Sequence, residues 1–198
     1  MTDKESQETQ ESSAQVGAEA SESRRGLLIV YTGNGKGKTT AALGMALRAV
    51  GYGWPICIIQ FVKGSWKYGE LEGLKRLRPE VELKVAGAGF VGIIDDKLPR
   101  EEHERMAREA LELVRNTLES GKYKLVILDE LNVAISLGLI SIEKVEEALD
   151  RAPRELNLVI TGRDAHERLI ERADLVTEMK EIKHPFQKGI LAKKGIDF

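Results

Sequence analysis

The sequence predicts an α/β fold of three layers, α/β/α, in which helices cover both faces of a mostly parallel central sheet. Three observations support this fold class. Short apolar runs recur along the chain, stretches with helical periodicity separate them, and a glycine-rich segment joins the first run to the first helix. Continuously apolar runs are typical of parallel strands that are covered on both faces. Their alternation with helices predicts βαβ units.

The first strand is expected at 27–31, directly after Gly26. It is a short run without a polar side chain before the terminal tyrosine hydroxyl, which indicates burial on both faces. Further strands of the same kind are expected at 56–61, 83–86, 125–128, 158–160 and 175–179.

The segments between these runs carry apolar residues at the three- and four-residue spacing of helices. We expect Gly51 and Gly121 to end the first two helices and Ser141 to cap the third. Asp164, with Glu167 three residues later, resembles a capping box for the fourth. The predicted helices are 38–50, 100–120, 141–149 and 164–172.

The chain divides into two regions of different composition. Residues 1–24 are rich in Ser, Glu, Gln and Ala and hold almost no large apolar side chains, so we expect a disordered polar tail. Residues 25–198 are expected to form one domain. The lone Cys57, within an apolar run, excludes an internal disulfide framework and is expected to be a buried, unreactive thiol in a reducing, cytoplasmic setting.

The overall composition argues against some classes of binding partner. The chain is 42% hydrophobic and 31% charged, as expected of a globular protein, and its formal net charge is -2. A net negative charge gives no general attraction to nucleic acid. The sequence has no apolar run long enough to span a membrane and no apolar secretory signal. We therefore expect no nucleic-acid or membrane partner.

A glycine-rich turn between a buried strand and a helix predicts a phosphate-binding loop of the P-loop NTPase type. Glycines allow successive backbone N–H groups to point at phosphate oxygens near a helix N-terminus. Lys38 is expected to contact the phosphates and the Thr39 hydroxyl to bind Mg²⁺. The usual first glycine of the pattern is replaced by Thr32. The expected ATP-binding residues are Gly33, Asn34, Gly35, Lys36, Gly37, Lys38, Thr39 and Thr40.

An acidic pair supplies the second half of the predicted site. Asp129 and Glu130 come directly after the apolar run at 125–128. The carboxyl ends of parallel strands are where open α/β sheets bind ligands, and carboxylate oxygens suit Mg²⁺. We expect these two residues and Thr39 to hold the metal, directly or through water.

A phosphate-binding loop does not identify one reaction. No Asn-Lys-x-Asp guanine-recognition motif is present, which argues against a GTPase. A small-molecule kinase would carry an arginine-rich lid, and the arginines between 151 and 172 are scattered through helical positions. An ATPase that uses Glu130 to orient water remains open. The scattered His103, His166 and His184 argue against a metal held by the protein alone.

Several segments together resemble a known family. They are YTGNGKGKTTAA at 31–42, QFVKGSW at 60–66, VILDELN at 126–132, TGR at 161–163, ADLVTEM at 173–179, KHPF at 183–186, 189–190 and 195–198. The resemblance is to the ATP:corrinoid adenosyltransferases of the cobalamin-synthesis type, from about Gly26 to the end of the chain. Thr32 in place of the first loop glycine is a trait of this family.

The resemblance implies an enzyme that transfers the 5′-deoxyadenosyl group of ATP to Co(I) of a reduced corrinoid (cobalamin, cobinamide or cobyrinic acid diamide) and releases triphosphate. It also implies Mg²⁺, with Mn²⁺ as a substitute, an electron donor for Co(II), and a homodimer. Family members are described as holding ATP reversed in the loop. The alternatives are a P-loop ATPase or small-molecule kinase, and a nucleotide-dependent module that delivers a corrinoid without catalysis.

The resemblance assigns catalytic roles to Lys38 and Phe90. Phe90, after Gly87-Ala88-Gly89, would displace the lower axial ligand of the corrinoid, although a core position explains this phenylalanine equally well. Where the family often has Trp, this chain has Gly92. Lys63 and Trp66 are expected to flank the corrinoid, with an ordinary surface loop as the alternative.

Overall fold

The computed structural model describes residues 25–61, 69–86 and 99–197 of the chain. Six strands form one sheet in the order β3-β2-β4-β5-β1-β6, and every strand pairing in it is parallel. The expected disordered tail, 1–24, lies outside the described residues. The strands are β1 (Leu28–Thr32), β2 (Ile56–Gln60), β3 (Val81–Val85), β4 (Leu125–Asp129), β5 (Asn157–Thr161) and β6 (Leu175–Glu178).

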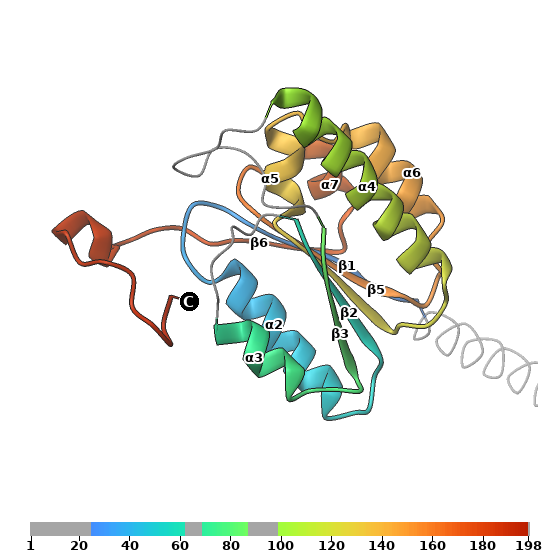
Figure 1. Ribbon diagram of the computed structural model, residues 1–198, viewed down its shortest axis with the longest axis horizontal. Helices are drawn as coiled ribbons and strands as arrows, with labels where there is room; N and C mark the ends of the chain where they lie inside the picture. The colour runs from blue at the N-terminus through green and yellow to red at the C-terminus, as the bar shows by residue number, and fades with distance from the viewer. Residues whose placement is uncertain (1–24, 62–68, 87–98, 198) are drawn as a thin grey trace, which may run out of the picture.

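Helices cover both faces of this sheet (Figure 1). Helices α2 and α3 lie on one face, and α4, α5, α6 and α7 lie on the other. The predicted three-layer α/β fold is therefore confirmed. The helices are α2 (Lys38–Val50), α3 (Gly69–Lys75), α4 (Arg100–Glu119), α5 (Leu131–Ser136), α6 (Ile142–Asp150), α7 (Glu167–Arg172) and the short 3-10 helix η1 (Pro185–Lys188).

The central strands are buried on both faces because their alternate side chains enter two separate apolar clusters. On β4, Val126 and Leu128 pack into the cluster under α4 and α6, whereas Leu125 and Ile127 pack into the cluster under α2. Side chains of successive strand residues point to opposite faces, so a strand between two helical layers needs apolar residues throughout. This explains the unbroken apolar runs in the sequence. Among the described residues, no helix is long and apolar enough to cross a membrane.

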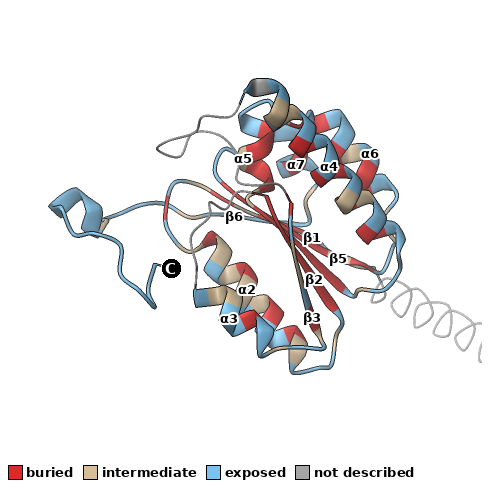
Figure 2. Cartoon of the chain, in the orientation of Figure 1, coloured by how far each residue is buried: buried red, intermediate tan, exposed pale blue. Residues whose placement is uncertain are grey.

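The last strand differs from the prediction of burial on both faces. All four residues of β6 are exposed, including Leu175 at 42% and Val176 at 38% (Figure 2). The strand is at the edge of the sheet and pairs only with β1. The prediction of buried apolar faces was wrong here because an apolar run does not reveal whether a helix covers the strand.

Two of the predicted helix caps also differ. Helix α7 begins at Glu167 with His166 as its N-cap, whose Nδ1 accepts a hydrogen bond from the Arg168 N–H, so Asp164 is not the cap. Asp164 instead adopts the left-handed conformation in the turn before the helix, with φ 53°. Ser141 occupies the N-cap position of α6 but makes no capping hydrogen bond with its side chain.

The thiol of Cys57 agrees with the sequence-based expectation. It is fully buried on β2, and burial raises its pKa to about 12. Because the thiolate is the reactive form, this thiol is poorly suited to nucleophilic chemistry near neutral pH.

Asp174 connects the starts of β1 and β6. One carboxylate oxygen accepts the Leu28 N–H at 2.9 Å, and the other accepts Arg25 at 2.5 Å. The Asp174 N–H in turn donates to the Leu28 carbonyl at 2.8 Å. The Leu28 N–H, followed by Arg25, lowers the pKa of the Asp174 carboxyl below its ordinary value of 3.8.

We predict that Asp174→Asn lowers the free energy of unfolding by ~1 kcal/mol at pH 7, because a charge-assisted hydrogen bond to a strand-end N–H is weakened. A depressed folded-state pKa stabilises the protein above the unfolded pKa, so the loss should shrink as pH falls below about 4. Urea denaturation of both proteins at pH 7 and pH 3 measures this. Asp150→Asn, which breaks only the exposed pair with Arg172, is the control and should change little. A deficit for Asp174→Asn that is the same at both pH values would contradict the assignment.

Candidate functional site

The predicted phosphate-binding loop occupies 33–37, between the end of β1 and the start of α2. Gly33 and Gly37 have φ of 91° and 120°, a region that favours glycine. Thr32, the replacement for the usual first glycine, is the last residue of β1 and is 8% exposed. Its hydroxyl accepts the Ala165 N–H at 3.1 Å, so it ties the loop to the turn before α7. This contact gives a physical reason for threonine at this position.

The loop lies directly against the chain that follows β6. The Gly35 N–H donates to the Met179 carbonyl at 2.6 Å. A Cβ on Gly33 would lie 2.6 Å from that carbonyl oxygen, and one on Gly35 would lie 2.7 Å from it. Both distances are shorter than a real side chain allows. Glycine is therefore required here for close backbone packing as well as for any approach of phosphate.

Lys38 begins α2 and is only 8% exposed. Its ammonium donates to the carbonyl oxygens of Gly33 at 2.7 Å and Gly35 at 2.9 Å, so the charge is directed into the loop. Burial lowers the pKa of Lys38, and the nearby negative charge of Glu130 opposes that shift. The arrangement places a desolvated cation within the loop at the N-terminus of α2, which suits an anionic ligand.

Asp129 makes several hydrogen bonds at the site and is 2% exposed. Its Oδ1 accepts the hydroxyl groups of Thr39 and Thr161, each at 2.8 Å. Its Oδ2 faces the amide of Gln60 at 3.4 Å. The carboxylate thus joins the ends of β2, β4 and β5 to the first turn of α2.

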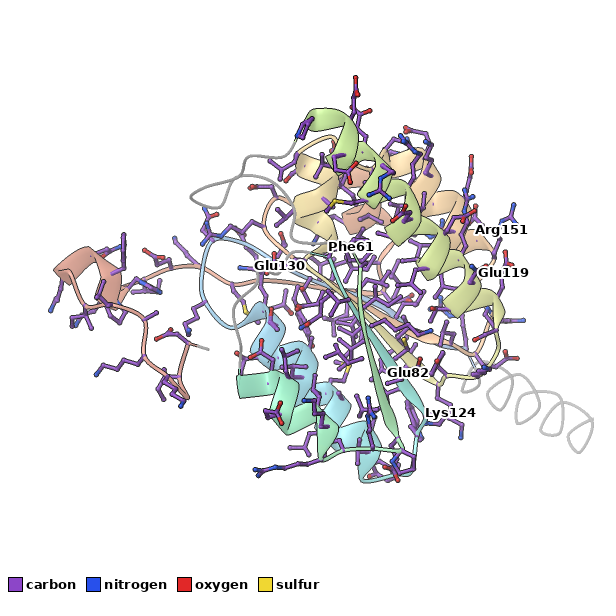
Figure 3. All side chains as sticks on the ribbon, in the orientation of Figure 1. Phe61, Glu82, Glu119, Lys124, Glu130 and Arg151 are labelled. Carbon is purple, nitrogen blue, oxygen red and sulfur yellow. The ribbon has the colours of Figure 1, made fainter. Side chains whose placement is uncertain are left out.

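Glu130 follows Asp129 and has a left-handed backbone conformation, with φ 64°. Its N–H donates to the Thr161 hydroxyl at 2.9 Å. Figure 3 shows Glu130 at the same end of the sheet as Phe61 and at the opposite end from Lys124. This is the carboxyl edge, where the sequence placed the site.

A cleft of about 1120 Å³ lies at this edge. It brings together nearly all the predicted binding residues, and it also includes residues for which no binding role was predicted. The predicted residues on its wall are Asn34, Gly35, Lys36, Gly37, Lys38, Thr39, Thr40, Asp129 and Glu130. Gly33 contributes through its carbonyl to Lys38.

Among the residues that were not predicted to bind ATP are Arg163, considered above only among the scattered arginines, and a set from the C-terminal segment after β6. Arg163 lies two residues after the end of β5, and this position at a strand end could have indicated a place at the site. The C-terminal segment extends from β6 and turns back toward α2 (Figure 1). There Lys36 forms an ion pair with Asp197, whose carboxylate also accepts the Lys193 N–H at 2.7 Å. The C-terminal residues on the cleft wall are Glu181, His184, Phe186, Gly195, Ile196 and Asp197.

The oxygen groups on the cleft wall suit a magnesium ion that is bound partly by the protein and partly by a nucleotide. Within the described ranges, no group of three His, Cys, Asp or Glu residues is placed to hold a metal ion. Thr39 donates its proton to Asp129, which leaves the hydroxyl oxygen lone pairs for another partner. Glu130 adds a carboxylate on the cleft wall. Mg²⁺ commonly takes one or two such protein ligands and completes its shell with phosphates and water.

Three residues expected to contact a corrinoid fall outside the described parts of the chain. Lys63 and Trp66 lie within 62–68, and Phe90 lies within 87–98. Their roles stay predictions.

We predict that Gly35→Ala lowers the free energy of unfolding by ~1–3 kcal/mol, because its Cβ would overlap the Met179 carbonyl. Gly44→Ala is the matched control. Gly44 lies inside α2, where a Cβ would meet no atom within 4 Å, so alanine should stabilise by ~0.5–1 kcal/mol. Thermal or urea denaturation compares the two. Wild-type stability in Gly35→Ala would show that the loop is not packed in this way.

Comparison with known proteins agrees with the geometry. The model of the ATP:corrinoid adenosyltransferase BtuR/CobO/CobP family matches residues 24–198. A protein of Escherichia coli (strain K12) named corrinoid adenosyltransferase is 40% identical over 175 residues, which cover 88% of this chain and 86% of that protein. A protein of the same name from Pseudomonas aeruginosa is 39% identical over 174 residues, which cover 88% of this chain and 84% of that protein.

A third relative is the corrinoid adenosyltransferase CobA of Salmonella typhimurium, 38% identical over 175 residues, which cover 88% of this chain and 86% of that protein. The family model covers the whole described domain, including the loop, the acidic pair and the C-terminal segment, and each of the three relatives matches 88% of the chain. The chain therefore belongs to the ATP:corrinoid adenosyltransferase family.

Proposed function

We propose that this chain transfers the 5′-deoxyadenosyl group of ATP to the Co(I) centre of a reduced corrinoid and releases triphosphate. The observation that carries the proposal is the family match over 24–198, which includes the P-loop cleft. In the reaction, the cobalt electron pair forms a Co–C bond to the ribose 5′-carbon. The C–O bond to the triphosphate breaks, and its electron pair leaves with the triphosphate.

In this reaction the protein needs mainly to position the substrates and to stabilise the charge that develops on the leaving group. Co(I) is itself a strong nucleophile, so no side-chain nucleophile or general base is required. Lys38 and the loop N–H groups would stabilise negative charge on the leaving triphosphate, and Lys36, on the cleft wall, would add a second cation. ATP bound in the reversed orientation of the family would suit reaction at the 5′-carbon.

Thr39 and Glu130 are proposed to hold Mg²⁺ together with ATP, with Mn²⁺ as a substitute. The metal would neutralise phosphate charge. Asp129 already accepts two hydroxyl hydrogen bonds on one oxygen, which favours orientation of Thr39 over direct ligation.

The corrinoid is proposed to lie beside the cleft, against Lys63, Trp66 and Phe90. Strands β2 and β3 are parallel to β4, so the chain enters 62–68 and 87–98 from the same edge of the sheet that carries Asp129. This connectivity supports the placement. Phe90 would act by displacing the lower axial ligand of the corrinoid.

We also propose a cytoplasmic homodimer that accepts electrons for Co(II) from a separate donor. The exposed apolar side chains on the edge strand β6 and on the segment after it support self-association, since an uncovered sheet edge can pair with another chain. They are Leu175, Val176, Ile182, Phe186, Ile190 and Leu191.

We predict that Lys38→Ala lowers kcat at least ~100-fold without unfolding the protein, because charge on the leaving group is left unneutralised. The assay uses ATP, Mg²⁺ and chemically reduced cobalamin with analysis of all products. Lys75→Ala, which removes an exposed lysine paired with Glu72, is the control and should keep full activity.

The wild-type products distinguish the functions. Triphosphate and adenosylcobalamin support the proposal, whereas ADP or phosphate would indicate a kinase or ATPase. Binding without either product would indicate a delivery module. Activity of Lys38→Ala within a few-fold of wild type would remove this loop from the mechanism.

A further inference from the structure

We propose that Thr161 is a positioning residue that fixes both acidic residues of the site, Asp129 and Glu130, through one buried hydroxyl. The inference rests on the proposed function for its consequence, metal binding with ATP. Its geometric part, the hydrogen bonding at the β4–α5 turn, is independent of the reaction.

Thr161 is the last residue of β5 and is fully buried. Its hydroxyl donates to Asp129 Oδ1 at 2.8 Å and accepts the Glu130 N–H at 2.9 Å. A backbone N–H can only donate and an ionised carboxylate can only accept, so the single hydroxyl proton must point to Asp129. Both hydrogen bonds therefore have a fixed direction.

The Thr161 hydroxyl helps to hold Glu130 in an unfavourable backbone conformation. A residue with a Cβ rarely adopts a φ of 64°, and such a conformation persists only where surrounding contacts determine it. The Thr161 hydroxyl accepts from the N–H of this residue. In a second contact, the amide of Asn132, two residues after Glu130, donates to the carbonyl of Gly162, the residue after Thr161, at 3.3 Å. A Cβ on Gly162 would lie 2.9 Å from the Asn132 Cβ, so the two turns are packed tightly.

The result is a continuous path from α2 to the cleft wall: the Thr39 hydroxyl, the Asp129 carboxylate, the Thr161 hydroxyl and the Glu130 N–H. The two proposed metal ligands, Thr39 and Glu130, are at its two ends. Loss of the Thr161 hydroxyl would remove one donor from Asp129 and leave a Glu130 N–H without its acceptor. Both metal ligands would then lose a constraint although Thr161 itself does not line the cleft.

The test compares Thr161→Val, which keeps the shape of the side chain, with Thr161→Ser, which restores the hydroxyl. Thr117→Val is the matched control. Thr117 lies on α4, away from the cleft, and is 3% exposed; its hydroxyl accepts a hydrogen bond from the Lys84 ammonium at 3.2 Å. Electron paramagnetic resonance measures Mn²⁺ affinity in the presence of ATP. Hydrogen exchange with mass spectrometry measures protection of the Glu130 N–H, and thermal denaturation confirms folding.

We expect Thr161→Val to weaken Mn²⁺ binding ~10- to 100-fold, the range found when partners of metal ligands are removed. Exchange at Glu130 should accelerate at least ten-fold. Thr161→Ser should restore both quantities to within about three-fold, and Thr117→Val should change neither. Wild-type Mn²⁺ affinity in a folded Thr161→Val protein would overturn the positioning role, as would unchanged exchange at Glu130. If the wild type binds Mn²⁺ and ATP but transfers no adenosyl group, the proposed function fails and the positioning role stands.

Discussion

The buried carboxylate of Asp129 is the interaction on which the site depends. It is 2% exposed and accepts hydrogen bonds from Thr39 and Thr161, so oriented hydroxyl groups help to compensate its charge. An ionised carboxylate without such partners would be strongly disfavoured in the interior. Because the donors come from α2 and β5, the requirement to satisfy one charge also fixes the relative positions of the phosphate-binding loop and the turn that carries Glu130.

The chain after β6 imposes a second constraint on the loop. Gly35 hydrogen-bonds to Met179 with no room for a Cβ at the contact, so Met179 holds the loop itself, whereas Asp129 holds the first turn of α2 through Thr39. Asp174 fixes the start of β6, which places that segment in register with β1. The edge strand, poor in buried contacts, thus contributes more to the shape of the cleft than to the core.

Much of this could be predicted from the sequence. Unbroken apolar runs correctly predicted the central parallel strands, and the loop and acidic pair were correctly placed at one edge of the sheet. Exposure of Leu175 could not be predicted, because a pattern records polarity and not the presence of a covering helix. The cap at His166 was missed because Asp164 and Glu167 match a common capping pattern. The role of Thr161 depends on a contact between strands that are far apart in sequence. The periodicity of apolar residues does not predict such a contact.

The central claim is that Asp129 acts on the metal largely by orienting Thr39. A double-mutant cycle with Thr39→Val, Asp129→Ala and the double variant tests it, with Mn²⁺ affinity in the presence of ATP as the measured quantity. If Asp129 acts through Thr39, the double variant should lose at least ~1 kcal/mol less than the sum of the single variants. Losses that add to within ~0.5 kcal/mol would show that the two residues act independently and would contradict the account.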